Sequence, residues 1–226
     1  KNIIKVYEFC DAKPEPFFVM EYFESENLKY SMWHLPERVY KKEFYILRQI
    51  GDALGHIHSK GIVHRDIKPE NVLVNKNGDI KLIDFSIAVG PLARIIPFLK
   101  PRTAGTPLYM SPEQFLNKGI SFRSDVYSFG VLIFELLTKR PPYSVKSLQE
   151  KHLHQPIPSM RQYIKTINKE LDDLVRSMLE KSPSKRPSDM RDILYQMAKW
   201  ERQLTHIRLQ QVNPVPDSDK HKKANP

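Results

Sequence analysis

The sequence of 226 residues has little cysteine and no long apolar run. Its single cysteine, Cys10, excludes an intrachain disulfide framework and a cysteine-rich zinc site, and it favours a reducing compartment such as the cytoplasm. A membrane-spanning helix needs roughly 20 apolar residues in succession, so we expect no membrane segment in this chain, and no signal peptide is visible.

The sequence also lacks a basic run interleaved with aromatic residues, although its net charge is +10 from 36 Lys+Arg against 26 Asp+Glu. The charges are dispersed along the chain, which is not the pattern of a nucleic-acid platform. We therefore expect no nucleic-acid partner. The positive surplus is interpreted as a solvated surface that can attract acidic partners.

The most informative stretch is His-Arg-Asp-Ile-Lys-Pro-Glu-Asn over residues 64–71, followed by Asp84-Phe85. Asp66 can accept a proton from an attacking hydroxyl, and Lys68 can neutralise charge on a transferring phosphate. Asn71 and Asp84 are hard oxygen ligands suited to Mg²⁺. Together these are the groups that phosphoryl transfer needs.

The segments around this loop are expected to be rigid. Apolar residues recur at three- and four-residue spacing over 41–60, which predicts a buried helix that ends at Gly61. Residues 72–74 and 80–83 flank Asn77-Gly78, a strong hairpin signal. We expect Asp84 to emerge from the second strand facing back towards Asp66.

The stretch resembles the catalytic loop and metal-binding motif of eukaryotic-type (Hanks-type) protein kinases, and Lys68 resembles the serine/threonine branch. The resemblance covers residues 1–204 and implies an α+β, protein-kinase-like fold. Residues 1–23 would be a remnant of N-lobe strands and hinge, with the last two strands of the N-lobe sheet, and 24–204 the mainly helical C-lobe. Residues 205–226 are polar and are expected to be a disordered tail.

The resemblance implies a serine/threonine protein kinase that acts on serine and threonine hydroxyls of protein substrates, with autophosphorylation as a further reaction. No Gly-rich loop, strand lysine or helix glutamate of that family is visible. Since the chain begins with Lys1 in a strand-like run, we interpret it as a truncated piece, whose activity alone is in doubt. The alternatives are a pseudokinase or scaffold that acts by protein binding, and a small-molecule phosphotransferase.

Two apolar segments, 3–9 and 17–22, are expected to form paired strands joined by a turn that contains proline. By resemblance, the second leads into the hinge that binds adenine. The implied ligands of ATP and of Mg²⁺ (or Mn²⁺) are Met20 as gatekeeper, Glu21 and Phe23 in the hinge, Leu73 as apolar floor, and Asn71 and Asp84 at the cation. Plain core packing is the alternative for Met20 and Leu73.

Residues 103–113 resemble the end of an activation segment. There Thr106 is implied to hydrogen-bond Asp66 and Lys68 and to mark a serine/threonine substrate. Thr103 is implied to be a phosphorylation site that Arg65 would bind as a regulatory switch. The alternative is that both threonines only form turns.

Three residues are implied to be structural. An apolar helix is predicted over 126–137, and Asp125 before it is expected to be its N-cap and to anchor the catalytic loop from below. Glu113 and Arg186 are implied to form a buried ion pair. Two further amphipathic helices are predicted over 171–179 and 190–204.

Overall fold

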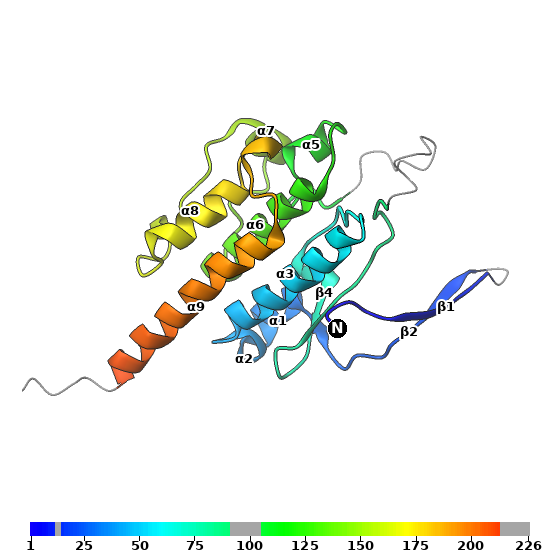
Figure 1. Ribbon diagram of the computed structural model, residues 1–226, viewed down its shortest axis with the longest axis horizontal. Helices are drawn as coiled ribbons and strands as arrows, with labels where there is room; N and C mark the ends of the chain where they lie inside the picture. Colours follow the sequence, from blue (N-terminus) through cyan, green and yellow to red (C-terminus); the bar gives the residue numbers. More distant parts are fainter. Residues whose placement is uncertain (12–14, 91–104, 213–226) are drawn as a thin grey trace, which may run out of the picture.

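The computed structural model describes residues 1–11, 15–90 and 105–212, with side chains up to residue 201 (Figure 1). The first part contains β1 (Val6–Cys10), β2 (Phe17–Met20), β3 (Glu26–Asn27), α1 (Leu28–His34), α2 (Pro36–Val39), α3 (Glu43–Ser59), the 3-10 turn η1 (Pro69–Asn71), β4 (Val72–Val74) and β5 (Ile80–Leu82). The second contains α5 (Pro112–Phe115), α6 (Phe122–Thr138), α7 (Leu148–His154), η3 (Met160–Gln162), α8 (Lys169–Met178), η4 (Pro183–Lys185) and α9 (Met190–Val212).

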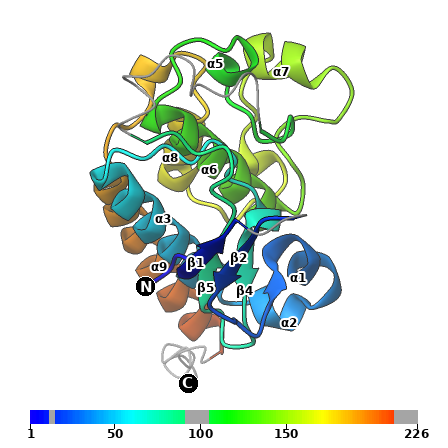
Figure 2. The same ribbon diagram turned by 90° about the vertical axis from the view of Figure 1, so that its right-hand side faces the viewer.

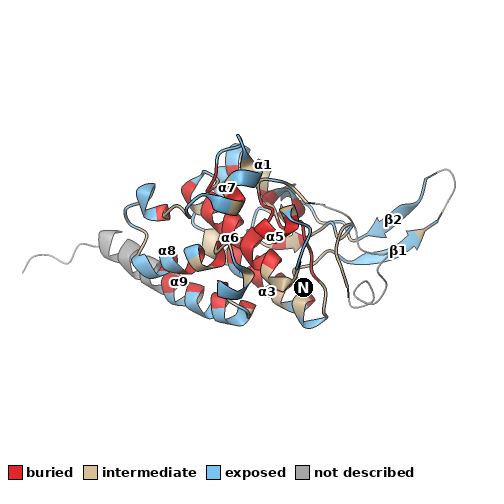
Figure 3. Cartoon of the chain, turned by 90° about the horizontal axis from the view of Figure 1, so that it is seen from above, coloured by how far each residue is buried: buried red, intermediate tan, exposed pale blue. Residues whose placement is uncertain are grey.

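Helix α6 lies at the centre of the molecule, and nearly all of its side chains are buried (Figure 3). It begins at Phe122, four residues earlier than predicted, because Ser121 is its N-cap. The Ser121 hydroxyl accepts a hydrogen bond from the Arg123 amide at 3.3 Å, and Ser124 accepts one from the Ser121 amide at 3.2 Å. The prediction that Asp125 caps this helix is therefore wrong, and Asp125 lies inside the first turn.

Helix α3 confirms its predicted periodicity and packs along α9 (Figures 1 and 2). Gly51 lies at their contact, where an added Cβ would be only 2.5 Å from Leu194 Cδ2, so the Leu194 side chain would have to shift to admit one. Helix α9 continues to Val212, so its backbone is helical over the first part of the segment that we expected to be a disordered tail. Among the described residues, no helix combines the length and the apolar character needed to span a bilayer.

The predicted hairpin is confirmed by β4 and β5, which pair antiparallel with Leu73 opposite Lys81. Its turn is closed by Asn75, whose Oδ1 accepts hydrogen bonds from the amides of Asn77 and Asp79, both at 2.9 Å. Gly78 adopts a φ of 87°, which favours glycine. Strand β3 completes a sheet of order β3-β4-β5, so the segment from the catalytic loop to Asp84 is held on a short, fixed scaffold.

The other pair, β1 and β2, forms an antiparallel hairpin that projects from the helical body (Figures 1 and 3). Its large apolar side chains are exposed, including Met20 at 51%. The alternative prediction, that Met20 packs in the core, is therefore wrong, because its side chain is exposed to solvent. The chain start is tied to β5, because the amide of Ile4 donates to the Leu82 carbonyl at 3.0 Å.

Candidate active site

Three predicted residues meet around the Asp66 carboxylate. Lys68 Nζ lies 2.6 Å from Asp66 Oδ2 and donates to Thr106 Oγ1 at 2.7 Å. The Thr106 amide and hydroxyl donate to Asp66 Oδ1 at 2.9 and 3.1 Å. Asn71 Nδ2 donates to Asp66 Oδ2 at 3.0 Å. The expected hydrogen bonds of Thr106 to Asp66 and Lys68 are confirmed.

The Asp66 loop is held from below by Asp125 on α6. Asp125 Oδ1 accepts from the Arg65 amide at 2.8 Å, and Oδ2 accepts from the His64 amide at 2.9 Å and contacts His58 Nε2 at 2.8 Å. Asp125 is fully buried. The anchoring role predicted for Asp125 is confirmed. With both amides held on one carboxylate, the loop has little freedom to shift Asp66.

Arg65 adopts a left-handed backbone with φ of 74°, a conformation that costs a non-glycine residue about 1 kcal/mol or more. The strain is offset by hydrogen bonds on both sides, since Gln114 Nε2 donates to the Arg65 carbonyl at 2.7 Å. The Arg65 side chain is buried, and Nη1 donates to the Ile87 carbonyl at 3.4 Å. Thr103 lies outside the described residues, so the predicted regulatory pair stays a prediction.

Asp84 follows β5 and is also left-handed, with φ of 62°. Ser86, two residues on, is not left-handed, so in this segment the unfavourable backbone conformation lies at Asp84. The Ser86 amide donates to Asp84 Oδ1 at 3.2 Å. Hydrogen bonding by Ser86, with a smaller contribution from the charge of Lys68, lowers the pKa of Asp84 and keeps its carboxylate ionised.

Asn71 and Asp84 fit a divalent cation by donor chemistry, since an amide oxygen and an ionised carboxylate are hard ligands. Asn71 Nδ2 is bound to Asp66, which leaves Oδ1 as the atom for a cation. Within the described ranges, no group of three or more His, Cys, Asp or Glu side chains could hold a metal. A cation between these two residues would therefore need further oxygens from phosphate or water.

Of the hinge residues, Tyr22 is exposed, whereas Glu21 and Phe23 are half-buried. The Glu21 carboxylate pairs with Lys81 and accepts from the Lys5 amide at 3.0 Å, which fixes the end of β2 against β5. Phe23 and Leu73 are half-buried, so Leu73 is not a core residue. A pocket of about 320 Å³ beside the hinge is lined by Tyr22, Phe23, Glu24, Arg38 and residues 75–77. It includes none of the residues around Asp66 and is separate from the catalytic groups.

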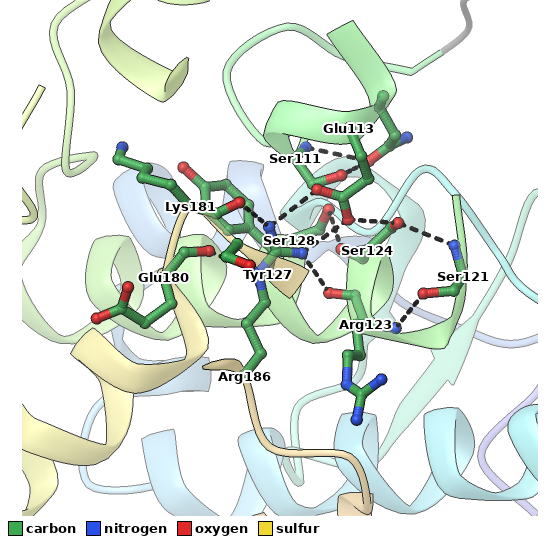
Figure 4. A network of polar contacts seen from close by, with 12 residues as sticks. Ser111, Glu113, Ser121, Arg123, Ser124, Tyr127, Ser128, Glu180, Lys181 and Arg186 are labelled. Atoms are coloured by element: carbon green, nitrogen blue, oxygen red, sulfur yellow. Dashed lines mark hydrogen bonds and ion pairs between the residues drawn. The ribbon is translucent and has the colours of Figure 1, made fainter. Parts of the chain in front are cut away.

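Glu113 and Arg186 form the predicted buried ion pair (Figure 4). Arg186 Nη1 and Nη2 donate to the two Glu113 oxygens at 2.7 and 2.9 Å, and Ser124 Oγ donates to Oε1 at 2.7 Å. Burial raises the pKa of the Glu113 carboxyl, but hydrogen bonds and charge from Arg186 outweigh it and hold that pKa below its usual value. The pair joins α5 to the segment before α9.

Sequence reasoning missed several positioning residues. His64 is buried with its Nε2 3.2 Å from the Ile83 carbonyl, and burial lowers its pKa, so the ring is neutral. His58 and Gln114 support the same loop from α3 and α5. His64 stands in the motif itself, but the partners of His58 and Gln114 lie 67 and 49 residues away. No local pattern could have found those two.

A profile of the protein kinase domain family matches residues 1–198 of this chain. Among curated proteins, serine/threonine-protein kinase Pkn1 of Myxococcus xanthus is 33% identical over 193 residues, which cover 82% of this chain and 28% of that protein. Serine/threonine-protein kinase PrkC of Bacillus subtilis is 32% identical over 195 residues (85% and 30%). Serine/threonine-protein kinase PknL of Mycobacterium tuberculosis is 33% identical over 192 residues (84% and 48%). The chain thus spans less than half the length of these relatives.

Proposed function

Because this chain belongs to the protein kinase domain family, we propose that it transfers the γ-phosphate of ATP to serine and threonine hydroxyls of protein substrates. The observation that carries the proposal is the convergence of Lys68 and Thr106 on Asp66. A cytoplasmic location stays a prediction, and it rests on the single cysteine, Cys10.

In the proposed reaction, the substrate hydroxyl oxygen attacks the γ-phosphorus, and the bond from that phosphorus to the bridging oxygen breaks to release ADP. Asp66 takes the hydroxyl proton, and Lys68 offsets negative charge on the transferring group. The Thr106 hydroxyl, hydrogen-bonded to both, keeps the Lys68 and Asp66 side chains in position. Asn71 and Asp84 would hold Mg²⁺ or Mn²⁺, which when bound neutralises charge on the nucleotide phosphates.

On the nucleotide side, we propose that the backbone of Glu21 and Phe23 binds the adenine edge, with Met20 beside it and Leu73 beneath. The pairing of Glu21 with Lys81 supports this placement, because it ties the hinge to the sheet that leads to Asp84. A further proposal concerns regulation, in which phosphorylation of Thr103, by autophosphorylation or by another kinase, would recruit Arg65.

A scaffold that binds proteins without transfer is the second candidate, and the exposed apolar side chains of β1 and β2 favour it. A scaffold, however, has no physical need for a lysine and an asparagine that both contact one carboxylate. Phosphate transfer gives each of these residues a role, so we favour it over the scaffold.

The experiment uses the longest natural form of the protein with Mg²⁺, radiolabelled ATP and a mixture of serine-, threonine- and tyrosine-containing peptides. We expect labelled phosphoserine and phosphothreonine, and loss of label when EDTA is present. Label on tyrosine alone would contradict the substrate class. Absence of label, together with retained protein binding, would favour the scaffold.

A further inference from the structure

The pocket of about 320 Å³ beside the hinge is formed by three segments that are distant in the sequence. Residues 22–24 follow β2, Arg38 comes from α2, and residues 75–77 form the turn between β4 and β5. Helix α2 lies next to β4 (Figure 2). The lining shares Phe23 with the proposed adenine site but contains neither the gatekeeper nor the apolar floor of that site. It is therefore a second cavity, to which the proposed reaction gives no role.

The wall formed by the β4–β5 turn is held in place from α3. Lys42 Nζ donates to the Lys76 carbonyl at 2.8 Å, and Gln49 Nε2 donates to the Gly78 carbonyl at 2.9 Å. These two contacts fix the turn on both sides of its tip. The shape of this wall is thus set by the fold itself.

The wall formed by the hinge is fixed as well. The Ser25 hydroxyl donates to the Phe23 carbonyl at 2.8 Å. Glu21, one residue before the pocket, pairs with Lys81 and accepts from the Lys5 amide at 3.0 Å. A pocket with fixed walls loses little conformational entropy when a ligand binds, which favours binding of even a small ligand.

The charged side chains of the lining favour an anion. Arg38 and Lys76 are cationic and Glu24 is anionic, and the Lys42 ammonium adds a further cation at the Lys76 carbonyl. Among the residues that the structure describes, the side chains of Arg38, Lys76 and Glu24 have no ion-pair or hydrogen-bond partner. Arginine matches the planar geometry of a carboxylate with two parallel hydrogen bonds. The half-buried Arg38 is therefore the expected anchor for a carboxylate.

The remaining lining and the size of the cavity favour an aromatic ligand. Tyr22, which is 90% exposed, and Phe23 both line the pocket. Aromatic rings attract other rings in stacked and edge-on arrangements. Pockets for small molecules span roughly 300–1,000 Å³, so a cavity of about 320 Å³ suits a ligand with one or two rings.

We propose that this pocket binds a small aromatic monocarboxylate, whose carboxylate pairs with Arg38 and Lys76 and whose ring packs against Tyr22. Glu24 at the exposed rim repels a second acidic group, which restricts the class to a single carboxylate. The inference goes beyond the proposed function, because binding at this pocket requires no phosphate transfer.

The test uses 2-naphthoate as the probe and its neutral amide, 2-naphthamide, as the matched control ligand. Binding to the longest natural form of the protein is measured by nuclear magnetic resonance titration. We expect saturable binding of 2-naphthoate with a Kd of about 1 mM or below, and binding of the amide that is at least about fivefold weaker. Saturating ADP with Mg²⁺ should change the Kd of 2-naphthoate by about twofold or less, because the two sites differ.

Three variants assign the binding to the pocket. Arg38→Gln should weaken 2-naphthoate about tenfold, the scale of a charge-assisted hydrogen bond, and leave 2-naphthamide unchanged. Tyr22→Ala should weaken both probes by about threefold, because it removes the stacking surface. Arg161→Gln removes the same charge from an exposed residue that does not line the pocket, and should stay within about twofold of the wild-type Kd.

Three results would overturn the proposal. The first is the absence of saturable 2-naphthoate binding up to about 10 mM. The second is displacement of 2-naphthoate by ADP, which would place the probe in the nucleotide site. The third is an equal loss of affinity in Arg38→Gln and Arg161→Gln, which would indicate attraction by the overall charge. Phosphate transfer is measured separately, so failure of either claim leaves the other intact.

Discussion

Helix α6 and the β1–β2 hairpin are both rich in large apolar residues, but they use them in opposite ways. Most of α6 is buried, whereas β1 and β2 are largely exposed (Figure 3). Phe129 in α6 is fully buried, and Phe18 in β2 is 60% exposed. The catalytic loop is tied to α6, because Asp125 holds the amides of His64 and Arg65. The hinge end of β2 is tied to the sheet by Glu21 and Lys81.

This difference shows which parts of the fold fix the positions of the candidate catalytic and nucleotide-binding residues. The position of Asp66 is fixed by buried hydrogen bonds of the preceding residues, from the His64 and Arg65 amides to Asp125 on α6 and from Gln114 on α5 to the Arg65 carbonyl. The position of Met20 depends on a two-stranded hairpin that buries little apolar area. We therefore expect damage to the core of α6 to propagate to the acceptor chemistry, and damage to the hairpin to remain local.

The largest expected effect on stability contrasts two phenylalanines. Phe129→Ala leaves a cavity in the core, so the free energy of unfolding should fall by about 3–5 kcal/mol. Phe18→Ala removes an exposed ring and should change it by about 0.5 kcal/mol or less. Urea unfolding of the chain followed by circular dichroism measures both. Similar losses from the two variants would break the contrast between the elements.

A buried and an exposed ion pair extend this comparison from apolar to charged side chains. Arg186→Met leaves the Glu113 carboxylate unpaired in the interior and should cost about 3–5 kcal/mol of unfolding free energy. The matched control is Arg191→Met, because Arg191 pairs with Asp189 at the surface with a side chain that is 87% exposed. That change should leave the unfolding free energy almost unchanged, because water and salt screen the exposed pair. If the two arginine variants unfold alike, the Glu113–Arg186 pair does not stabilise the fold.

A smaller effect should appear as acid sensitivity near α6. The Tyr127 hydroxyl lies 2.9 Å from Nδ1 of His152, which is fully buried, and burial lowers the pKa of His152 to about 4. In the unfolded chain the His152 imidazole binds its proton already near pH 6.5. The free energy of unfolding should therefore be highest above pH 6.5 and fall as the pH is lowered towards 4, by up to about 3 kcal/mol.

Unfolding free energies between pH 7.5 and 4.5 measure this loss. His152→Gln should flatten the pH dependence relative to the wild-type chain. His154→Gln is the matched control on the same helix, because His154 is exposed, and it should leave the slope unchanged. A wild-type slope that persists in His152→Gln would assign the acid sensitivity to other groups.

The sequence predicted the parts of the molecule that local patterns encode. Helix α3 follows from apolar spacing, the β4–β5 hairpin follows from Asn77-Gly78, and the groups around Asp66 follow from one continuous motif. The N-cap of α6 was misplaced because Ser121 and Ser124 form a capping box without an acidic residue, whereas Asp125 carries the typical capping side chain.

Tertiary pairings without a local signature were not predictable. Lys29 and Glu135 lie 106 residues apart, and each alone reads as an ordinary charged residue on a helix. The exposure of β1 and β2 could not be predicted either, because the sequence of an apolar strand does not show what packs against it. Aspartate tolerates the left-handed region better than most residues, but this tolerance alone does not mark Asp84 in the sequence as left-handed.

The most direct test of the account is the rate of phosphate transfer by Asp66→Asn in the longest natural form of the protein. Asn keeps the size of the side chain but cannot accept the hydroxyl proton, so the rate should fall by at least about 10²-fold with the melting temperature little changed. Asp52→Asn, an exposed carboxylate on α3, should stay within about twofold of the wild-type rate. A wild-type protein that transfers phosphate while Asp66→Asn keeps a similar rate would contradict the assignment of Asp66 as the proton acceptor.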